Sequence, residues 1–140
     1  MNSETPAAGC SRGVRLHRRL VLWQKSVSLV EEGYRLTAGL PASERYGLAA
    51  QLRRAAVSIP SNIAEGAARQ TKREFAQFLF MARGSMSEVD TQMEIARRLG
   101  FLGAGDMQQL DRDLEELMKL LHGVLRSLGR SRTASSDSRT

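Results

Sequence analysis

The segment from residue 48 to 67 constrains the fold most, because its apolar residues keep helical spacing across a proline. These apolar residues are Leu48, Leu52, Ala55, Ala56, Ile59, Ile63 and Ala67. Pro60 lies among them and lacks the N–H that a helix interior needs, at a cost of about 3 kcal/mol. The nearby side chains of Ser58, Ser61 and Asn62 can bond to the freed backbone groups. We therefore predict one long helix, kinked near Pro60.

Three other segments show the same period. From about residue 16 to 38 the apolar stripe is Leu20, Trp23, Val27, Val30 and Tyr34. After residue 71 it is Phe75, Phe78, Ala82, Met86, Val89, Met93 and Ala96. After residue 106 it is Met107, Leu110, Leu114, Leu117, Leu121, Val124 and Leu128. Alternating β-strand patterns are absent, so we predict an all-α, up-down-up-down antiparallel four-helix bundle.

Capping residues set the expected boundaries. Ser43 and Asp106 are the expected N-caps of the second and fourth helices. Thr71 and Glu74 have the spacing of a capping box at the start of the third. The third helix is expected to end at Gly100 or Gly103, and Gly129 to end the fourth. The expected organisation is a disordered leader at 1–12, the bundle at 13–129 and a disordered basic tail at 130–140.

The charge pattern becomes informative once the topology is fixed. The formal net charge is +6. In an up-down bundle, the starts of helices one and three lie at the same end of the bundle as the ends of helices two and four. Ten basic residues fall there: Arg12, Arg15, Arg18, Arg19, Arg69, Lys72, Arg73, Arg126, Arg130 and Arg132. Cations at helix C-termini are favoured by the helix dipole, but those in first turns are not. We predict that this end binds nucleic acid through phosphates; the alternative is a merely solvated basic surface.

The second helix also carries a small apolar stripe on its outer side. Ala50, Val57 and Ala64 recur every seven residues, with Tyr46 and Ala68 nearby. Either alanine serves here as a helix former, or the stripe is a subunit contact. Arg53 and Arg54 flank the core stripe. They either contact RNA or pair with Glu65, Glu88 or Asp90 across helices or subunits, and we favour pairing.

The sequence offers little for an enzyme. Its two histidines, His17 and His122, lie in no metal-binding or catalytic spacing, and no phosphate-binding loop occurs. Gly84 and Ser85 are interpreted as a close-packing feature of the third helix. We predict no catalytic residue, no metal and no cofactor. The single cysteine, Cys10, and the lack of a long apolar run favour a cytoplasmic protein without a membrane partner.

The string Ser-Ile-Pro-Ser-Asn-Ile-Ala-Glu-Gly at 58–66, with Arg-Tyr-Gly-Leu at 45–48, carries a family resemblance. Further matching stretches lie at 22–25, 34–37, 75–79, 84–96 and 99–102. The chain resembles the 23S rRNA intervening-sequence proteins, a family that includes the accessory variability proteins of diversity-generating retroelements. The resemblance implies a four-helix bundle, a homopentamer and, in the retroelement setting, a reverse transcriptase as partner.

Together these observations predict a non-enzymatic, oligomeric four-helix-bundle protein that binds RNA or other nucleic acid through its basic end. The alternative is a protein–protein interaction scaffold without nucleic-acid binding.

Overall fold

The computed structural model describes residues 16–137, and side chains within that range except those of residues 18, 19 and 130–137. Four α-helices and two short 3₁₀ turns make up this part of the chain, and it contains no strand. The helices are α2 (Val21–Thr37), α3 (Leu48–Ala67), α4 (Lys72–Arg98) and α5 (Ala104–Asp137); the 3₁₀ turns are η1 (Leu16–Arg19) and η2 (Ala42–Glu44). The predicted all-α class is confirmed.

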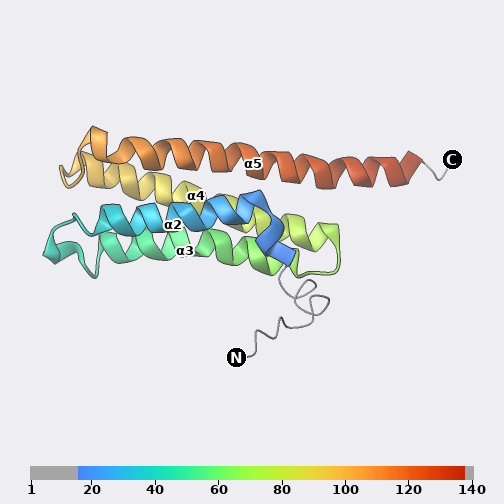
Figure 1. Cartoon of the computed structure of the whole chain (residues 1–140), viewed down its shortest axis with the longest axis horizontal. Helices are drawn as coiled ribbons and strands as arrows, with labels where there is room; N and C mark the ends of the chain where they lie inside the picture. Colours follow the sequence, from blue (N-terminus) through green and yellow to red (C-terminus); the bar gives the residue numbers. More distant parts are fainter. Residues whose placement is uncertain (1–15, 138–140) are drawn as a thin grey trace, which may run out of the picture.

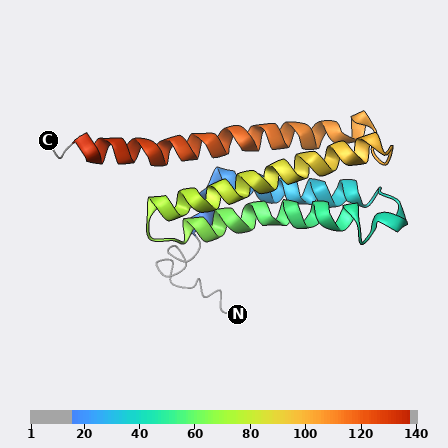
Figure 2. The same cartoon turned by 180° about the vertical axis from the view of Figure 1, so that it is seen from behind.

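The helices run antiparallel in chain order, as Figure 1 shows. Each packs on its neighbour in sequence, and α5 also packs on α2, which closes a four-sided bundle. The last turns of α5 project beyond the ends of the other three helices in both views (Figures 1 and 2). One end of the bundle therefore holds η1, the start of α2, the end of α3, the start of α4 and the C-terminal part of α5.

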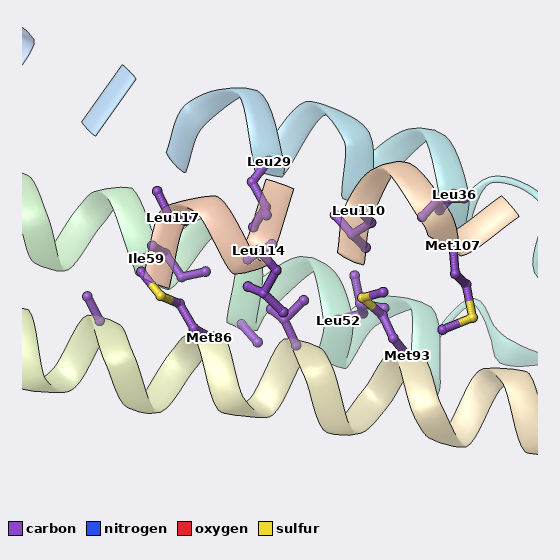
Figure 3. Close-up of a cluster of buried hydrophobic side chains, with 14 of the residues drawn as sticks. Leu29, Leu36, Leu52, Ile59, Met86, Met93, Met107, Leu110, Leu114 and Leu117 are labelled. Atoms are coloured by element: carbon purple, nitrogen blue, oxygen red, sulfur yellow. The ribbon is translucent and has the colours of Figure 1, made fainter. Parts of the chain in front are cut away.

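Large aliphatic and methionine side chains fill the space between the four helices, as Figure 3 shows. Most predicted core positions on α3, α4 and α5 are confirmed, and Leu52, Ile59, Met86, Met93, Leu110 and Leu117 are at most 1 % exposed. Each such side chain contributes about 1.5–3 kcal/mol through removal of its apolar surface from water. At the start of α4 the prediction is wrong, because Leu79 is fully buried and the predicted Phe75 and Phe78 are only half-buried. The core thus follows the 3,4 spacing of these three helices.

The core face of α2 differs from the predicted one. Its buried residues are Leu22, Ser26, Leu29, Gly33, Leu36 and Thr37, whereas Trp23 and Val30 only flank the core and Tyr34 is exposed. The prediction followed the largest apolar residues, but α2 buries two small ones. Ser26 satisfies its hydroxyl on the carbonyl of Trp23 at 2.7 Å. A Cβ on Gly33 would lie 3.5 Å from Leu52 and 3.8 Å from Ala56, in ordinary van der Waals contact, so this buried position faces α3.

Pro60 lies inside α3, which continues without interruption to Ala67. Ser61 donates its hydroxyl to the carbonyl of Val57 at 2.9 Å, and the Asn62 amide donates to the carbonyl of Ser58 at 2.8 Å. The neighbouring polar side chains thus bond to backbone carbonyls close to the proline, those of Val57 and Ser58, and bonding to the freed carbonyl of Ala56 stays a prediction.

Four predicted helix boundaries are wrong. The first helix does not begin at about residue 16, because Leu16–Arg19 form η1 and α2 begins at Val21. The second helix does not begin at Ser43, which lies in η2; α3 begins at Leu48, whose N–H donates to the carboxylate of Glu44 at 3.1 Å. The fourth begins before Asp106, whose carboxylate accepts the Gly103 N–H at 3.1 Å from inside the first turn. It also continues past Gly129 to Asp137, so the predicted tail is helical at 130–137. The leader at 1–12 lies outside the described residues.

Candidate nucleic-acid interface

The basic residues singled out by the sequence come from elements that meet at one end of the bundle (Figure 1). We call this the basic end and define it by Arg69, Lys72, Arg73 and Arg126, whose side chains are described and exposed. The backbones of Arg18 and Arg19 lie in η1, which packs on α2 and α3. Those of Arg130 and Arg132 lie on the projecting turns of α5. Arg12 and Arg15 lie outside the described residues.

The first turn of α4 is fixed by Thr71. Its hydroxyl oxygen accepts the Glu74 N–H at 3.1 Å, and the hydroxyl donates to the Glu74 carboxylate at 2.9 Å. One of the two hydrogen bonds of the predicted capping box is therefore present. In place of the other, the Glu74 carboxylate accepts a hydrogen bond from the Thr71 hydroxyl and not from the Thr71 backbone N–H. The cap places Lys72 and Arg73 at the first two helical positions, where the helix dipole already carries partial positive charge.

The cations of the basic end are only partly neutralised within the chain. Arg69 pairs with Glu65 at 3.2 Å and covers the ring of Phe78, with its guanidinium carbon 4.8 Å from the ring centroid. Among the described residues, no carboxylate lies within ion-pairing distance of Arg73 or Arg126. The basic end thus keeps positive charge that the fold does not use.

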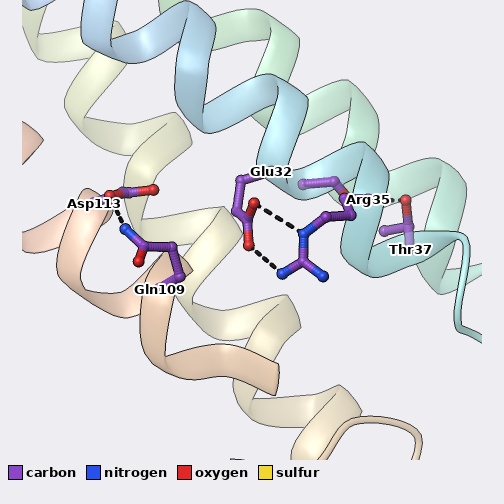
Figure 4. Close-up of polar contacts among 6 residues, drawn as sticks. Glu32, Arg35, Thr37, Gln109 and Asp113 are labelled. Carbon is purple, nitrogen blue, oxygen red and sulfur yellow. Dashed lines mark hydrogen bonds and ion pairs between the residues drawn. The ribbon is translucent and has the colours of Figure 1, made fainter. Parts of the chain in front are cut away.

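Three arginines at the opposite end have carboxylate partners, whereas Arg45 lies over the Tyr46 ring, with its guanidinium carbon 5.7 Å from the ring centroid. Arg35 binds Glu32 through two hydrogen bonds (Figure 4). Arg97 and Arg98 both bind Glu94, and their hydrogen bonds lower the pKa of that carboxyl to about 2. Nearby, burial raises the pKa of Asp111, assisted by the charges of Asp90 and Glu94. The far end is therefore mixed to acidic, as the sequence predicts.

The predicted subunit interface on α3 is present as an exposed surface. Tyr46 is 87 % exposed and Val57 40 %, Ala68 is exposed, and Ala50 and Ala64 are half-buried. Contact with another subunit at this surface stays a prediction.

Within the chain, no carboxylate pairs with Arg53 among the described residues, and pairing across subunits stays a prediction. The Nε of Arg53 donates to the Thr37 hydroxyl at 2.7 Å and its guanidinium carbon lies 4.5 Å from the Tyr34 ring centroid, so Arg53 links α3 to α2. Arg54 is exposed and shares a polar groove between α3 and α4 with Glu88.

Sequence reasoning missed a groove between the start of α4 and the C-terminal part of α5. We call it the α4–α5 groove. Its volume is about 340 Å³, and its lining is Lys72, Arg73, Ala76, Gln77, Phe80, Leu125, Leu128 and Gly129. Phe80 is 47 % exposed. The signal was the position of Phe80, an aromatic residue outside the apolar stripe of α4 and about two helical turns from Lys72 and Arg73.

The comparisons with known proteins bear on this fold. The sequence profile described as 23S rRNA-intervening sequence protein matches residues 18–123. A crystal structure from the S23 ribosomal protein family of Bacteroides thetaiotaomicron, of a protein with unknown function, aligns with a TM-score of 0.69 at 23 % identity. The alignment covers 75 % of this chain and 98 % of that one, and it supports the bundle fold. No curated protein matches the chain.

Within residues 16–137, no helix is both long and apolar enough to cross a membrane, and no three histidine, cysteine or acidic side chains are grouped to hold a metal ion.

Proposed function

The chain belongs to the 23S rRNA-intervening sequence protein family, and we propose that it is a non-enzymatic protein that binds RNA or other nucleic acid through its basic end. One observation carries the proposal. Arg35, Arg97 and Arg98 of the far end bind Glu32 and Glu94, while Arg73 and Arg126 have no carboxylate partner among the described residues. A cluster of like charges costs free energy in the isolated protein, and phosphates of a polyanion would offset that cost.

Helix geometry supports the same proposal. Lys72 and Arg73 lie in the first turn of α4, where the helix dipole disfavours cations by up to about 1 kcal/mol each. The same dipole and the free N–H groups of a helix N-terminus attract anions. Cations in this position weaken the isolated helix but strengthen its hold on a phosphate.

The proposal extends to a homo-oligomer, with five subunits as the family resemblance implies. Contact through the outer side of α3 would repeat the basic end around a ring, and several weak sites on one rim bind one polyanion more tightly than any single site. Two settings fit such a ring: a protein encoded within an rRNA intervening sequence, and an accessory subunit of a retroelement reverse transcriptase. A reverse transcriptase gene beside this one would identify the second.

The oligomer is tested at Val57. We expect Val57→Glu to reduce the native mass, measured by light scattering, from several chains to one, because a buried unpaired carboxylate is costly at an interface. Its side chain is 40 % exposed in the single chain, so helicity should not change. Ile95→Glu, at a residue 43 % exposed on α4, is the matched control. A wild-type protein that is already a monomer would contradict the oligomer.

The nucleic-acid function is tested by salt titration of the wild-type protein with several unrelated RNAs. If four or more phosphates are contacted, affinity should fall about 50-fold or more between about 50 and 200 mM salt, similarly for all sequences. A peptide nucleic acid of the same bases, which has no phosphates, should not bind. If no RNA is retained even at low salt, the scaffold alternative replaces this proposal.

A further inference from the structure

The α4–α5 groove differs from the other apolar hollow beside α5. The second hollow, of about 650 Å³, lies on the side of α5 that faces Leu20 and Phe75, and its charged lining residues are Glu116 and Lys119, which balance each other. The α4–α5 groove has Lys72 and Arg73 on its rim and no acidic residue in its lining. Of these two hollows, which are lined by described residues, the α4–α5 groove is the one that combines an apolar surface with a net positive charge.

Phe80 forms the aromatic part of this groove. The guanidinium carbon of Arg83 lies 4.9 Å from the Phe80 ring centroid, while Arg83 is not among the residues that line the groove. The arginine thus holds the ring without filling the groove. Gln77, one turn before Phe80, adds an amide that can donate to and accept from the edge of a base.

These features match the chemistry of an unpaired nucleotide. Single-stranded nucleic acids are bound by aromatic rings that stack on bases, together with cations that follow the phosphates. The volume of about 340 Å³ lies at the lower end of the range for small-molecule sites. A duplex keeps its bases paired and stacked, so it could reach the cations but not Phe80.

We infer that the α4–α5 groove binds an unpaired base of single-stranded RNA or DNA against Phe80, while Lys72 and Arg73 hold the flanking phosphates. This inference rests on the proposed nucleic-acid function and names the form of nucleic acid that the basic end prefers. The inference and the proposed function can fail separately, because phosphates can bind to the basic end without a base that stacks on Phe80.

The test is fluorescence anisotropy with three probes: a labelled single strand, the same sequence as a duplex, and inorganic polyphosphate as an unlabelled competitor. We expect Phe80→Ala to weaken single-strand binding about 5- to 150-fold, the range found when a stacking aromatic is removed. Duplex binding and competition by polyphosphate should not change. Phe80→Tyr, which keeps the ring, should bind the single strand like wild type.

Ile95→Ala is the matched control, since Ile95 is on the same helix and 43 % exposed against 47 % for Phe80. Helicity of each variant is measured by circular dichroism, and Phe80→Leu replaces Phe80→Ala if the latter does not fold. Equal losses on single strand and duplex, or no loss on either, would overturn the inference and leave the salt-dependent binding in place. If the wild-type protein bound none of the probes, both this inference and the proposed nucleic-acid function would be contradicted.

Discussion

Replacing Arg18, Arg19, Lys72 and Arg73 with alanine is expected to weaken RNA binding about a thousandfold at roughly 0.1 M salt. Each phosphate contact contributes about 0.7–0.9 to the slope of log affinity against log salt. Four lost contacts should therefore make the slope shallower by about 3. These residues occupy η1 and the first turn of α4, where removing a cation also relieves the conflict with the helix dipole. Stability should thus be unchanged or slightly higher, and the loss is one of binding.

The far end of the bundle supplies the control. Replacing Arg35, Arg45, Arg97 and Arg98 with alanine removes four charges as well, so both variants change the formal net charge from +6 to +2. These arginines lie at the far end, where Arg35 pairs with Glu32 and both Arg97 and Arg98 pair with Glu94. We expect this variant to keep most of the RNA affinity. Equal losses in both variants would show that binding follows total charge and has no preference for the basic end.

The sequence predicts those parts of the fold in which large apolar residues alone mark the buried face. On α5 the stripe through Leu110, Leu117 and Leu121 is fully buried, as its spacing indicates. On α2 the apolar stripe does not mark the buried face, because the buried residues there include Ser26 and Gly33. A hydrophobicity pattern selects neither residue. Gly33 is buried because Leu52 and Ala56 of α3 lie against it. Such a contact is a property of the assembled bundle.

For the candidate site, too, one feature can be predicted from the sequence and another cannot. The meeting of the arginine-rich segments at one end depends only on chain path, so the sequence predicts it. The α4–α5 groove requires in addition that α5 continue past Gly129, which was interpreted as a helix stop. A glycine ends a helix when it adopts a positive φ, as Gly100 does at 76°, and Gly129 does not. At Gly100 the N–H of Phe101 reaches the carbonyl of Ala96 at 2.9 Å, the hydrogen bond of a Schellman motif.

Two helical glycines, Gly84 within α4 and Gly66 in the last turn of α3, have opposite surroundings that the sequence does not reveal. Gly84 was expected to be a close-packing position, but a Cβ there would meet no atom within 4 Å; its neighbour Ser85 is the buried one and bonds to Ser58 at 2.8 Å. At Gly66, a Cβ would lie 2.7 Å from the Cβ of Phe78 and 2.9 Å from the ring of Phe75. Close packing of α3 on α4 is therefore at Gly66.

Alanine at these two positions is expected to change stability in opposite directions. Gly66→Ala should destabilise the protein by about 1–3 kcal/mol, because the added methyl group forces apart two helices at a backbone-proximal contact. Gly84→Ala should stabilise it by up to about 1 kcal/mol, because alanine loses less conformational freedom in a helix and has room here. Urea unfolding followed by circular dichroism measures both free energies of unfolding.

The sign of the Gly84→Ala change also depends on the surroundings of α4 in solution. In the isolated chain the added methyl group faces open space, so any destabilisation would mean that another copy or partner approaches this side of α4 closely. Repeating the unfolding at several protein concentrations separates the two cases, since only an interface makes the stability concentration-dependent. A neutral Gly66→Ala variant would contradict the close contact between α3 and α4 at Phe78. It would then also contradict the position of the first turn of α4, which carries Lys72 and Arg73.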